Sequence, residues 1–351
     1  MKKRPLILLL SFFILIFCVA SSGCGLESIL PDKYAQKAEL TVSFIDVAQG
    51  DATLIECGGE AALIDAGLYS EADNVLSYLN RRGIRELKYC VATHPHSDHI
   101  GGMSKVIYNT YVDTLVYPLC EDSSNMNSIF DACDERGVSY LTPNPLDTLR
   151  VGEAVIQVLS PEAYADYGNL NNNSLVLKLE YENVSFLFMA DAEKEVEQEL
   201  LAMDIDLNAD VLKAGHHGSS TSSHSDFINA VTPSVAIISC GKGNDYGHPH
   251  KETVSAFERR SVNMLRTDRL STIMAESDGE TVTFSANGET LSRITPDTFT
   301  EYSYTGNLKT NVFHENSCDS AKNMKEYNKM YFYTREDAVK KGYNPCKACN
   351  P

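Results

Sequence analysis

Short apolar segments alternate with segments of helical periodicity along most of this chain. Strand-like segments recur in two blocks, at 40–46, 52–56, 61–67, 87–93, 115–117 and 138–141, and then at 154–160, 175–180, 184–189, 211–218, 234–239 and 281–285. Helical patterns lie between them at 71–82, 103–108, 125–136, 192–203, 224–231 and 251–260. Strands and helices that alternate in two blocks predict an α/β fold with mixed sheets, in which 281–285 is the last strand.

The strand predicted at 87–93 runs directly into a cluster of potential metal ligands. His94, His96, Asp98 and His99 all lie within six residues. Imidazole nitrogens and carboxylate oxygens together suit zinc or a similar divalent ion. A polar turn with incidental histidines is the simpler alternative, but the density of the cluster favours a metal site. The alternation allows His94 and His96 to bind one ion while Asp98 and His99 bind a second.

The motif His-x-His-x-Asp-His followed by Gly-Gly, at 94–102, resembles the signature of the metallo-β-lactamase superfamily. The stretches 44–65, 171–191, 212–223 and 244–250 are similar to the soluble hydrolase domain of the ComEC family of DNA-uptake proteins. The resemblance covers roughly 39–290 and implies a four-layer αββα sandwich over 39–293. It also implies two divalent ions, zinc or manganese, that activate a water molecule for hydrolysis.

The resemblance assigns roles to residues that follow other predicted strands. Asp191 is the expected bridging ligand, although it could instead cap the helix predicted at 192–203. One of His216 and His217 should complete the second metal site, with a slight preference for His216. Asp65 is expected to support the metal-binding loop without binding metal itself. Asp98 is expected to accept a proton while it binds metal.

Residues near the mouth of the expected site have less certain roles. His248, in the motif Gly-His-Pro-His, could contact substrate or donate a proton to the leaving group, or it could belong to a rigid turn. The run 218–223 could hold a phosphate through backbone amides and hydroxyls. The alternative for this run is a capping box, in which Ser223 and Asp226 open the helix at 224–231.

Two positions depart from the family pattern. The chain has no histidine between His99 and His216, where many superfamily members have one, and Asn172, Asn173 and Ser174 stand there instead. The first metal would therefore keep His94, His96 and Asp191, with a fourth position that is open or weakly held.

The second departure lies in the first predicted turn. Ala48 replaces the first glycine of the family pattern Asp-Val-Gly-Gln-Gly-Asp. In the same turn, Asp46 and Asp51 could order the loop near the metals or simply cap it.

The first 24 residues have the pattern of an export signal. Lys2, Lys3 and Arg4 precede an apolar run over 6–20, and Ser-Ser-Gly-Cys ends at Cys24. The sequence thus predicts a lipoprotein anchored through Cys24, followed by a tether over 25–38. Cleavage after Ala20 and an uncleaved anchor are the alternatives, and all three place the main domain outside the cytoplasm.

The C-terminal region carries a second set of metal-binding residues. His314, Cys318, Cys346 and Cys349 have the spacing of a closed tetrahedral zinc site, which a module as short as 311–351 needs for stability. This region, after a predicted linker at 294–310, resembles the zinc-binding domain of the DNA-repair protein Ada. His314 stands where that family has its methyl-accepting cysteine, so methyl transfer is not expected.

Charge changes the choice among functions. The chain has a formal net charge of -18, so metal ions and the tail must supply much of any attraction to nucleic acid. The tail carries the lysines Lys322, Lys325 and Lys329 and also Arg335, which are candidates for DNA contact. The leading hypothesis is a phosphodiesterase or nuclease that acts on extracellular DNA. The alternatives are an envelope hydrolase of other phosphoesters or esters, and a surface DNA-binding protein with weak catalysis.

Overall fold

The computed structural model describes residues 39–119, 124–161, 167–296 and 301–351. The predicted signal segment, Cys24 and the tether therefore lie outside the described residues. Within the described ranges, the helices all fall short of the length and apolar character that a membrane span requires.

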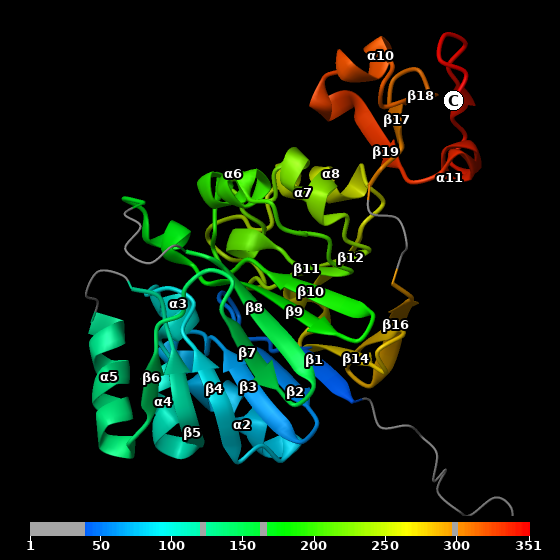
Figure 1. The fold of residues 1–351 in the computed structure, drawn as a ribbon. Coiled ribbons are helices and arrows are strands. Elements are labelled where there is room, and N and C mark those ends of the chain that lie inside the picture. The colour runs from blue at the N-terminus through cyan, green and yellow to red at the C-terminus, as the bar shows by residue number, and fades with distance from the viewer. Residues whose placement is uncertain (1–38, 120–123, 162–166, 297–300) are drawn as a thin grey trace, which may run out of the picture. The chain divides into compact units, whose positions relative to one another are not determined.

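One sheet of the larger domain has nine strands within the described residues, in the order β16-β15-β14-β1-β2-β3-β4-β5-β6 (Figure 1). It combines β1 to β6 from the start of the domain with β14 to β16 from its end. The strands are β1 (Leu40–Phe44), β2 (Thr53–Cys57), β3 (Glu60–Ile64), β4 (Glu86–Val91), β5 (Tyr111–Val116), β6 (Ser139–Leu141), β14 (Ile273–Ser277), β15 (Val282–Ala286) and β16 (Glu289–Ile294). Its helices are η1 (Tyr69–Glu71), α2 (Ala72–Arg82), α3 (Ser97–Ile100), α4 (Met103–Asn109) and α5 (Ser124–Arg136). Strands β3 to β6 are parallel, and the others pair antiparallel.

The second sheet of the larger domain has seven described strands in the order β13-β12-β11-β10-β9-β8-β7. The strands are β7 (Thr148–Val151), β8 (Ala154–Ser160), β9 (Val176–Tyr181), β10 (Val184–Phe188), β11 (Val211–Lys213), β12 (Val235–Ile238) and β13 (Asn263–Arg266). Its helices are η2 (Leu170–Asn173), α6 (Lys194–Ala202), η3 (Gly215–Gly218), α7 (Ser225–Val231), α8 (Lys251–Glu258) and α9 (Thr267–Leu270). Strands β10 to β13 are parallel.

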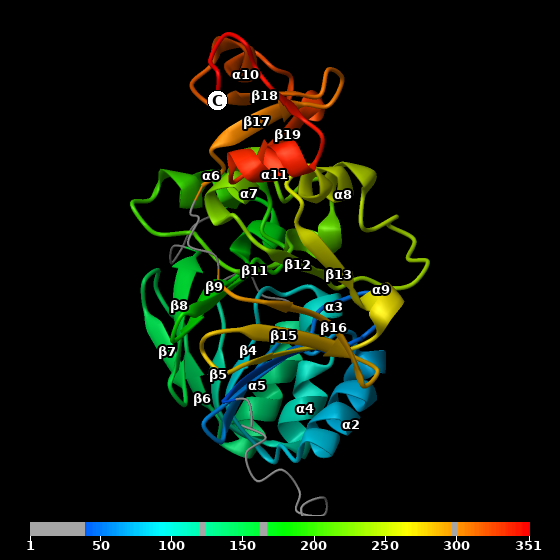
Figure 2. The same ribbon diagram turned by 90° about the vertical axis from the view of Figure 1, so that its right-hand side faces the viewer.

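Three apolar cores hold these layers together. Alternate residues of the two sheets, such as Val42, Phe44 and Phe186, form a core between the sheets. A second core lies between the first sheet and α2, α4 and α5, and a third lies between the second sheet and α6, α7 and α8. Figure 2 shows the two sheets between these helices. The alternation of buried side chains within single strands makes each sheet apolar on both faces, which confirms the predicted αββα sandwich.

The C-terminal module has a small sheet of its own, with the described strands in the order β19-β17-β18-β20. The elements are β17 (Tyr304–Asn307), β18 (Val312–Glu315), α10 (Asp319–Lys322), η4 (Glu326–Asn328), β19 (Lys329–Phe332), α11 (Arg335–Lys340) and β20 (Asn344–Pro345). Strand β17 lies inside the segment predicted to be a linker.

The last strand of the larger domain was predicted at 281–285, and this prediction is wrong because β16 follows it. Strand β16 is mostly exposed and has no buried alternation that would mark it as a strand.

Candidate metal centre

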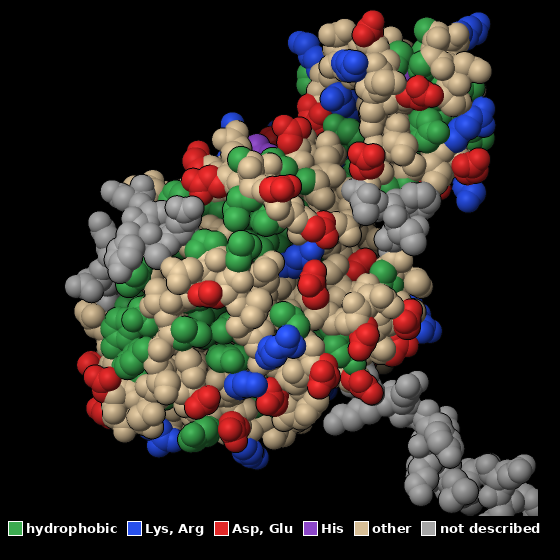
Figure 3. Space-filling view, viewed as in Figure 1, with side chains coloured by type: hydrophobic (Ala, Val, Ile, Leu, Met, Phe, Trp, Pro, Cys, Tyr) green, Lys and Arg blue, Asp and Glu red, His purple; other side chains and the backbone are tan. Residues whose placement is uncertain are grey.

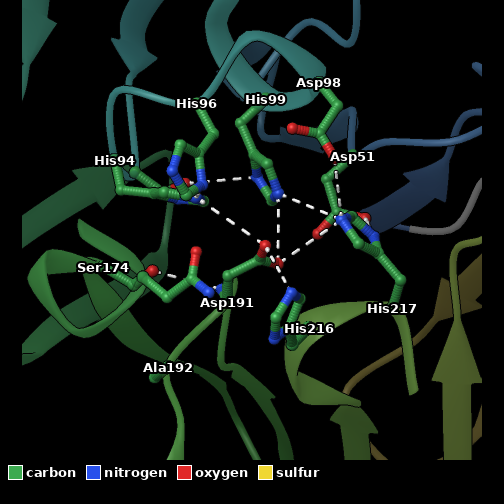
Figure 4. Close-up of polar contacts among 12 residues, drawn as sticks. Asp51, His94, His96, Asp98, His99, Ser174, Asp191, Ala192, His216 and His217 are labelled. Carbon is green, nitrogen blue, oxygen red and sulfur yellow. Dashed lines mark hydrogen bonds and ion pairs between the residues drawn. The ribbon is translucent and has the colours of Figure 1, made fainter. Parts of the chain in front are cut away.

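The carboxyl ends of β4, β10, β11 and β12 meet at one edge of the two facing sheets, and they carry the predicted ligands there. His94, His96 and the helix α3 follow β4, Asp191 follows β10, and His216 and His217 follow β11. The ends of parallel strands are the usual place for a functional site in such sheets, because the loops that follow them converge. Figure 4 shows Asp191 at the centre of this group, with the histidines around it.

One oxygen of Asp191 faces the cluster of Asp98, His99 and His217. Asp191 Oδ1 lies 3.1 Å from His99 Nε2 and 3.5 Å from His217 Nε2. His217 Nε2 is also 3.2 Å from Asp98 Oδ2 and 3.3 Å from His99 Nε2. Four ligand atoms from three separate chain segments therefore converge on one point, as they would around a single divalent ion.

The other oxygen of Asp191 faces His94 and His96. Asp191 Oδ2 lies 3.7 Å from His94 Nε2, which in turn is 3.1 Å from His96 Nδ1. His216 Nε2 is 3.7 Å from the same oxygen. The sequence slightly favoured His216 over His217 as the ligand of the second metal, and this geometry favours the opposite choice. His217 lies with Asp98 and His99, whereas His216 lies on the side of His94 and His96.

Asp191 is held by its backbone rather than by the helix that follows. Its amide donates to Ser174 Oγ at 3.1 Å, and the preceding residue, Ala190, has a φ of 46°. Helix α6 begins at Lys194 with Glu193 as its N-cap, so the alternative role of Asp191 as a helix cap is wrong. Asp191 is buried, and its Oδ1 has no hydrogen-bond partner of acceptable geometry among the described residues. A buried carboxylate oxygen in this state fits a cation, which would supply the missing partner.

His99 and His217 each use Nδ1 for a hydrogen bond that turns Nε2 toward Asp191. His99 Nδ1 donates to Asp65 Oδ2 at 2.7 Å, and His217 Nδ1 donates to the carbonyl of Ser239 at 3.1 Å. Asp65 also accepts from the amide of Thr93 at 3.0 Å and from its hydroxyl at 2.7 Å. Such contacts fix the tautomer that leaves Nε2 free to bind a metal. The geometry therefore places Asp65 where the supporting role was expected.

The electrostatics of the cluster favour anionic carboxylates. Burial alone would raise the pKa of Asp191, but His217, His99 and His94 hold it well below the usual range. Burial would lower the pKa of His217, but Asp191, Asp51 and Asp98 raise it to about 9. The raised pKa of His217 means that the cluster holds a proton on this imidazole when no metal is bound. A divalent cation would take the place of that proton, because it supplies positive charge to the same carboxylates.

The sequence assigned Asp51 only the ordering or capping of its loop, and it assigned no role to Lys213, which pairs with Asp51 beside this cluster. Lys213 Nζ lies 2.8 Å from Asp51 Oδ2, and Asp51 Oδ1 lies 3.6 Å from His217 Nδ1. The ligand atoms of Asp51, His99, Asp191 and His217 lie close enough together to bind one ion. The carboxylate of Asp51, however, is already neutralised by Lys213. The available signal was a lysine at the end of an otherwise apolar strand.

The loop at 218–223 does not form the phosphate site that was considered. The amide of Ser220 donates to His250 Nδ1, and the amide of Thr221 donates to Ser219 Oγ. The carboxylate of Glu197 accepts from the amides of Ser223 and His224. The predicted capping box is also wrong, because α7 begins at Ser225 and Glu197, from α6, takes the place of Asp226.

A pocket of about 290 Å³ opens over both clusters. Its lining residues are Gln49, His96, Ser97, Asp98, Asn171, Asp191, His216, His217, Tyr246 and His248. The ring of His248 lies 5.6 Å from that of His216, centroid to centroid, and its Nδ1 has no hydrogen-bond partner. Burial and the neighbouring histidines lower the pKa of His248 to about 4. The imidazole therefore faces the pocket in its neutral form, which suits contact with a substrate.

The C-terminal module brings its four predicted ligands together. His314, Cys318, Cys346 and Cys349 offer ligand atoms that all lie within 4.8 Å of one another. His314 Nδ1 is 3.6 Å from Cys318 Sγ, and Cys346 Sγ accepts from the amide of Ala348 at 3.3 Å. Burial and the neighbouring thiols raise the pKa of Cys349 to about 11. The donor set and its geometry fit a closed zinc site.

Known proteins with similar sequences cover both parts of the chain. The sequence profile of the metallo-beta-lactamase superfamily matches residues 45–242, and that of the metal binding domain of Ada matches residues 295–351. ComE operon protein 3 of Bacillus subtilis (strain 168) is 35% identical over 267 residues, which are 71% of this chain and 34% of that protein. Competence protein ComA of Neisseria gonorrhoeae is 27% identical over 253 residues, which are 70% of this chain and 33% of that protein.

The chain thus spans about a third of the length of the curated relatives that it matches. Among solved structures, the metallo-beta-lactamase fold protein YhfI from Bacillus subtilis aligns with a TM-score of 0.48 and 13% identity over 68% of this chain and 99% of that one. The family match covers more than half of the chain, and its signature histidines and aspartates are the residues that converge around Asp191. This chain therefore belongs to the metallo-beta-lactamase superfamily, and it carries a C-terminal metal-binding module similar to that of Ada.

Proposed function

We propose that this chain is an exported phosphodiesterase that cleaves DNA outside the cytoplasm with the help of two divalent ions. The observation that carries the proposal is the carboxylate of Asp191, whose two oxygens face two different clusters. Two ions bound there would supply an activated water and would bind the oxygens of a phosphoryl group. Zinc and manganese both suit imidazole and carboxylate ligands of this kind.

The residues of this chain supply the binding of the ions and the handling of protons. His94, His96 and Asp191 would hold one ion, and His99, Asp191 and His217 would hold the other. Asp98 would join the second group, since its Oδ2 lies 3.2 Å from His217 Nε2. The side chain of Asp98 is 26% exposed and lines the pocket, so its carboxylate can accept a proton beside the substrate. His248 contacts the substrate from the opposite loop.

Two further features favour DNA as the substrate. One relative is named for competence, and the C-terminal module resembles the metal binding domain of Ada. That module carries seven Lys and Arg against five Asp and Glu over 311–351, whereas the chain as a whole is acidic. Figure 3 shows acidic and basic side chains together on the larger domain and on the smaller module, so the difference between them lies in the balance of charge. The module can therefore hold a polyanion that the larger domain would repel.

A nuclease assay tests the proposal. The purified full chain is incubated with linear duplex and single-stranded DNA, in zinc or in manganese, beside the Asp98→Ala/His99→Ala double variant. His224→Ala serves as a matched control, because His224 pairs with Glu197 outside both clusters. We expect cleavage by the wild type and by His224→Ala and none by the double variant. Equal background cleavage by all three proteins would contradict the proposal.

The composition of the pocket favours one other candidate, a hydrolase of small phosphoesters or esters at the cell envelope. The residues that line the pocket include two carboxylates and neither lysine nor arginine. A small diester needs less electrostatic attraction than a DNA strand. A panel of chromogenic diesters and acyl esters distinguishes a nuclease from such a small-ester hydrolase. A nuclease would cleave DNA at a far lower substrate concentration than it needs for any compound of the panel.

The proposal includes export as a lipoprotein, through Cys24 at the end of the apolar segment. Growth of expressing cells with labelled palmitate should label the wild-type chain and not a Cys24→Ser variant. Label that persists in the variant would rule out this anchor.

A further inference from the structure

Tyr246 presents a large aromatic ring at the mouth of the pocket. It lies in the loop between β12 and α8, and 66% of its surface is exposed. The other rings that line the pocket are histidines, and the rest of the lining is polar or charged. About two thirds of the surface of Tyr246 stays in water, so burial of its ring contributes little to folding.

The ring of Tyr246 continues a row of rings that leads toward the metal clusters. It stacks on His248 with centroids 5.6 Å apart and an interplanar angle of 19°. The ring of His248 is in turn 6.2 Å from that of His217. A planar group that stacked on Tyr246 would therefore lie beside the pocket in which Asp98 and Asp191 face the substrate.

The loop that carries Tyr246 is fixed by hydrogen bonds. Asn244 Nδ2 donates to the carbonyls of Gly241 at 2.9 Å and His248 at 2.7 Å, and Asn244 Oδ1 accepts from the amide of His248 at 2.9 Å. The carbonyl of Tyr246 lies 3.2 Å from His250 Nε2. A ring on such a loop is ordered before a ligand binds, so little conformational entropy is lost on binding.

Two lysines lie at the ends of the same loop. Lys242 and Lys251 are exposed, four residues before and five residues after Tyr246. Their charge is partly offset by Asp245 and by Glu252, whose Oε1 is 3.8 Å from Lys251 Nζ. An exposed aromatic ring with exposed cations near it in the chain suits the binding of single strands, since bases stack on the ring and cations attract phosphates.

We propose that Tyr246 is a stacking platform for an unpaired nucleobase, and that it makes the site selective for single-stranded DNA. The inference rests on the proposed function and names its substrate class. In a duplex each base is already stacked between its neighbours, so only an unpaired base can lie on the tyrosine ring. The stacked base positions the adjoining phosphodiester over the two metal clusters.

Binding of fluorescent oligonucleotides tests this role. The full chain in an Asp98→Asn background, which prevents cleavage, is titrated with a single-stranded oligothymidylate that carries one 2-aminopurine, and with an abasic strand of equal length. Tyr246→Ala should weaken binding of the base-bearing strand about tenfold, as expected from the loss of one stacked base, and should abolish the quenching of 2-aminopurine. Binding of the abasic strand should stay the same. Tyr246→Phe should retain both affinity and quenching.

A matched control is Tyr111→Ala, which removes a ring that is 56% exposed at the start of β5, away from the carboxyl ends of the strands. Equal weakening of the base-bearing and abasic strands by Tyr246→Ala, or no weakening of either, would overturn the inference. Failure of the wild type to bind or cleave any nucleic acid would instead overturn the proposed function, and the inference with it.

Discussion

Lys213 and Asp51 form an ion pair of 2.8 Å between Nζ and Oδ2, at the point where the two sheets face each other beneath the metal clusters. The two residues are 162 positions apart, and both side chains are buried. Lys213 ends β11 of the second sheet, and Asp51 lies in the loop that joins β1 and β2 of the first. The pair therefore joins the two sheets of the domain. It also holds the carboxylate of Asp51 beside His217.

Loss of one partner of this pair should strongly destabilise the protein. We expect Lys213→Met to lower the free energy of unfolding in urea by about 3–5 kcal/mol, because it leaves the carboxylate of Asp51 buried without a counter-charge. The Asp51→Asn/Lys213→Met double variant should recover part of that loss. Lys88→Met is the control, since it removes a surface pair with Glu60 and should cost less than about 1 kcal/mol. A double variant less stable than Lys213→Met would contradict the account.

The support that Asp65 gives to His99 should appear in metal affinity. Asp65→Asn places an amide where His99 Nδ1 needs an acceptor, and so it disturbs the tautomer that directs Nε2 inward. We expect metal affinity to fall by about 10- to 100-fold, with the fold retained. Competition with a chelator, followed by metal analysis, measures this change. Asp278→Asn, in an exposed turn, should leave the affinity unchanged.

His216 should contribute to the first metal position and not to the second. Its Nε2 faces Asp191 Oδ2, and its Nδ1 is held at 3.1 Å from Thr221 Oγ1 and 3.2 Å from Glu193 Oε1. This chain lacks the intermediate histidine of many superfamily members, and His216 lies where it can take that place. We expect His216→Ala to weaken one of two bound ions by at least about tenfold, and His217→Ala to weaken the other. Titration with cobalt, read by its absorption spectrum, separates the two; loss of the same ion in both variants would refute the assignment.

The sequence was informative wherever a ligand follows a buried strand. Strand β8 (Ala154–Ser160) has the predicted bounds, and α2 ends at Arg82, as the helix predicted at 71–82 does. Strand β11 was predicted to continue to Gly218, but it ends at Lys213 and the 3-10 helix η3 follows. Apolar runs and caps are local signals, so they could be interpreted from the sequence without knowledge of the fold.

Other features depend on distant contacts or on backbone geometry, which the sequence pattern does not show. The pairing of Lys213 with Asp51 spans both sheets. The choice between His216 and His217 depends on two successive residues with φ of 48° and 54°, which turn adjacent side chains to different sides of Asp191. The exposed strand β16 and the short strand β17 carry too few buried positions to be recognised.

Ala48 shows why the family pattern has glycine at its position. Its φ is 54°, in the left-handed region that costs a residue with a Cβ atom about 1–2 kcal/mol. Glycine would remove that strain and lose about 0.5–1 kcal/mol through greater freedom of the unfolded chain. We therefore expect Ala48→Gly to raise the free energy of unfolding in urea by about 0.5–1 kcal/mol. Ala132→Gly, in the interior of helix α5, should lower it instead. A loss of stability in Ala48→Gly would show that the left-handed conformation carries no strain here.

The C-terminal module should depend on its metal for folding. Its apolar core consists of Phe313, Phe332, Ala338 and Tyr343, with two partly buried neighbours, which is too small to stabilise a module of this length. We expect Cys349→Ser to remove one metal ion per chain and to increase hydrogen exchange throughout 302–351. Peptides from β1 to β6 are the internal control, because the core that they form does not include the module. Peptides around Ser225, Thr232 and Arg260 are left out of the control, because these residues contact the module. Exchange in 302–351 that stays slow in the variant would show that packing alone holds the module, and that the four ligands serve a purpose other than folding.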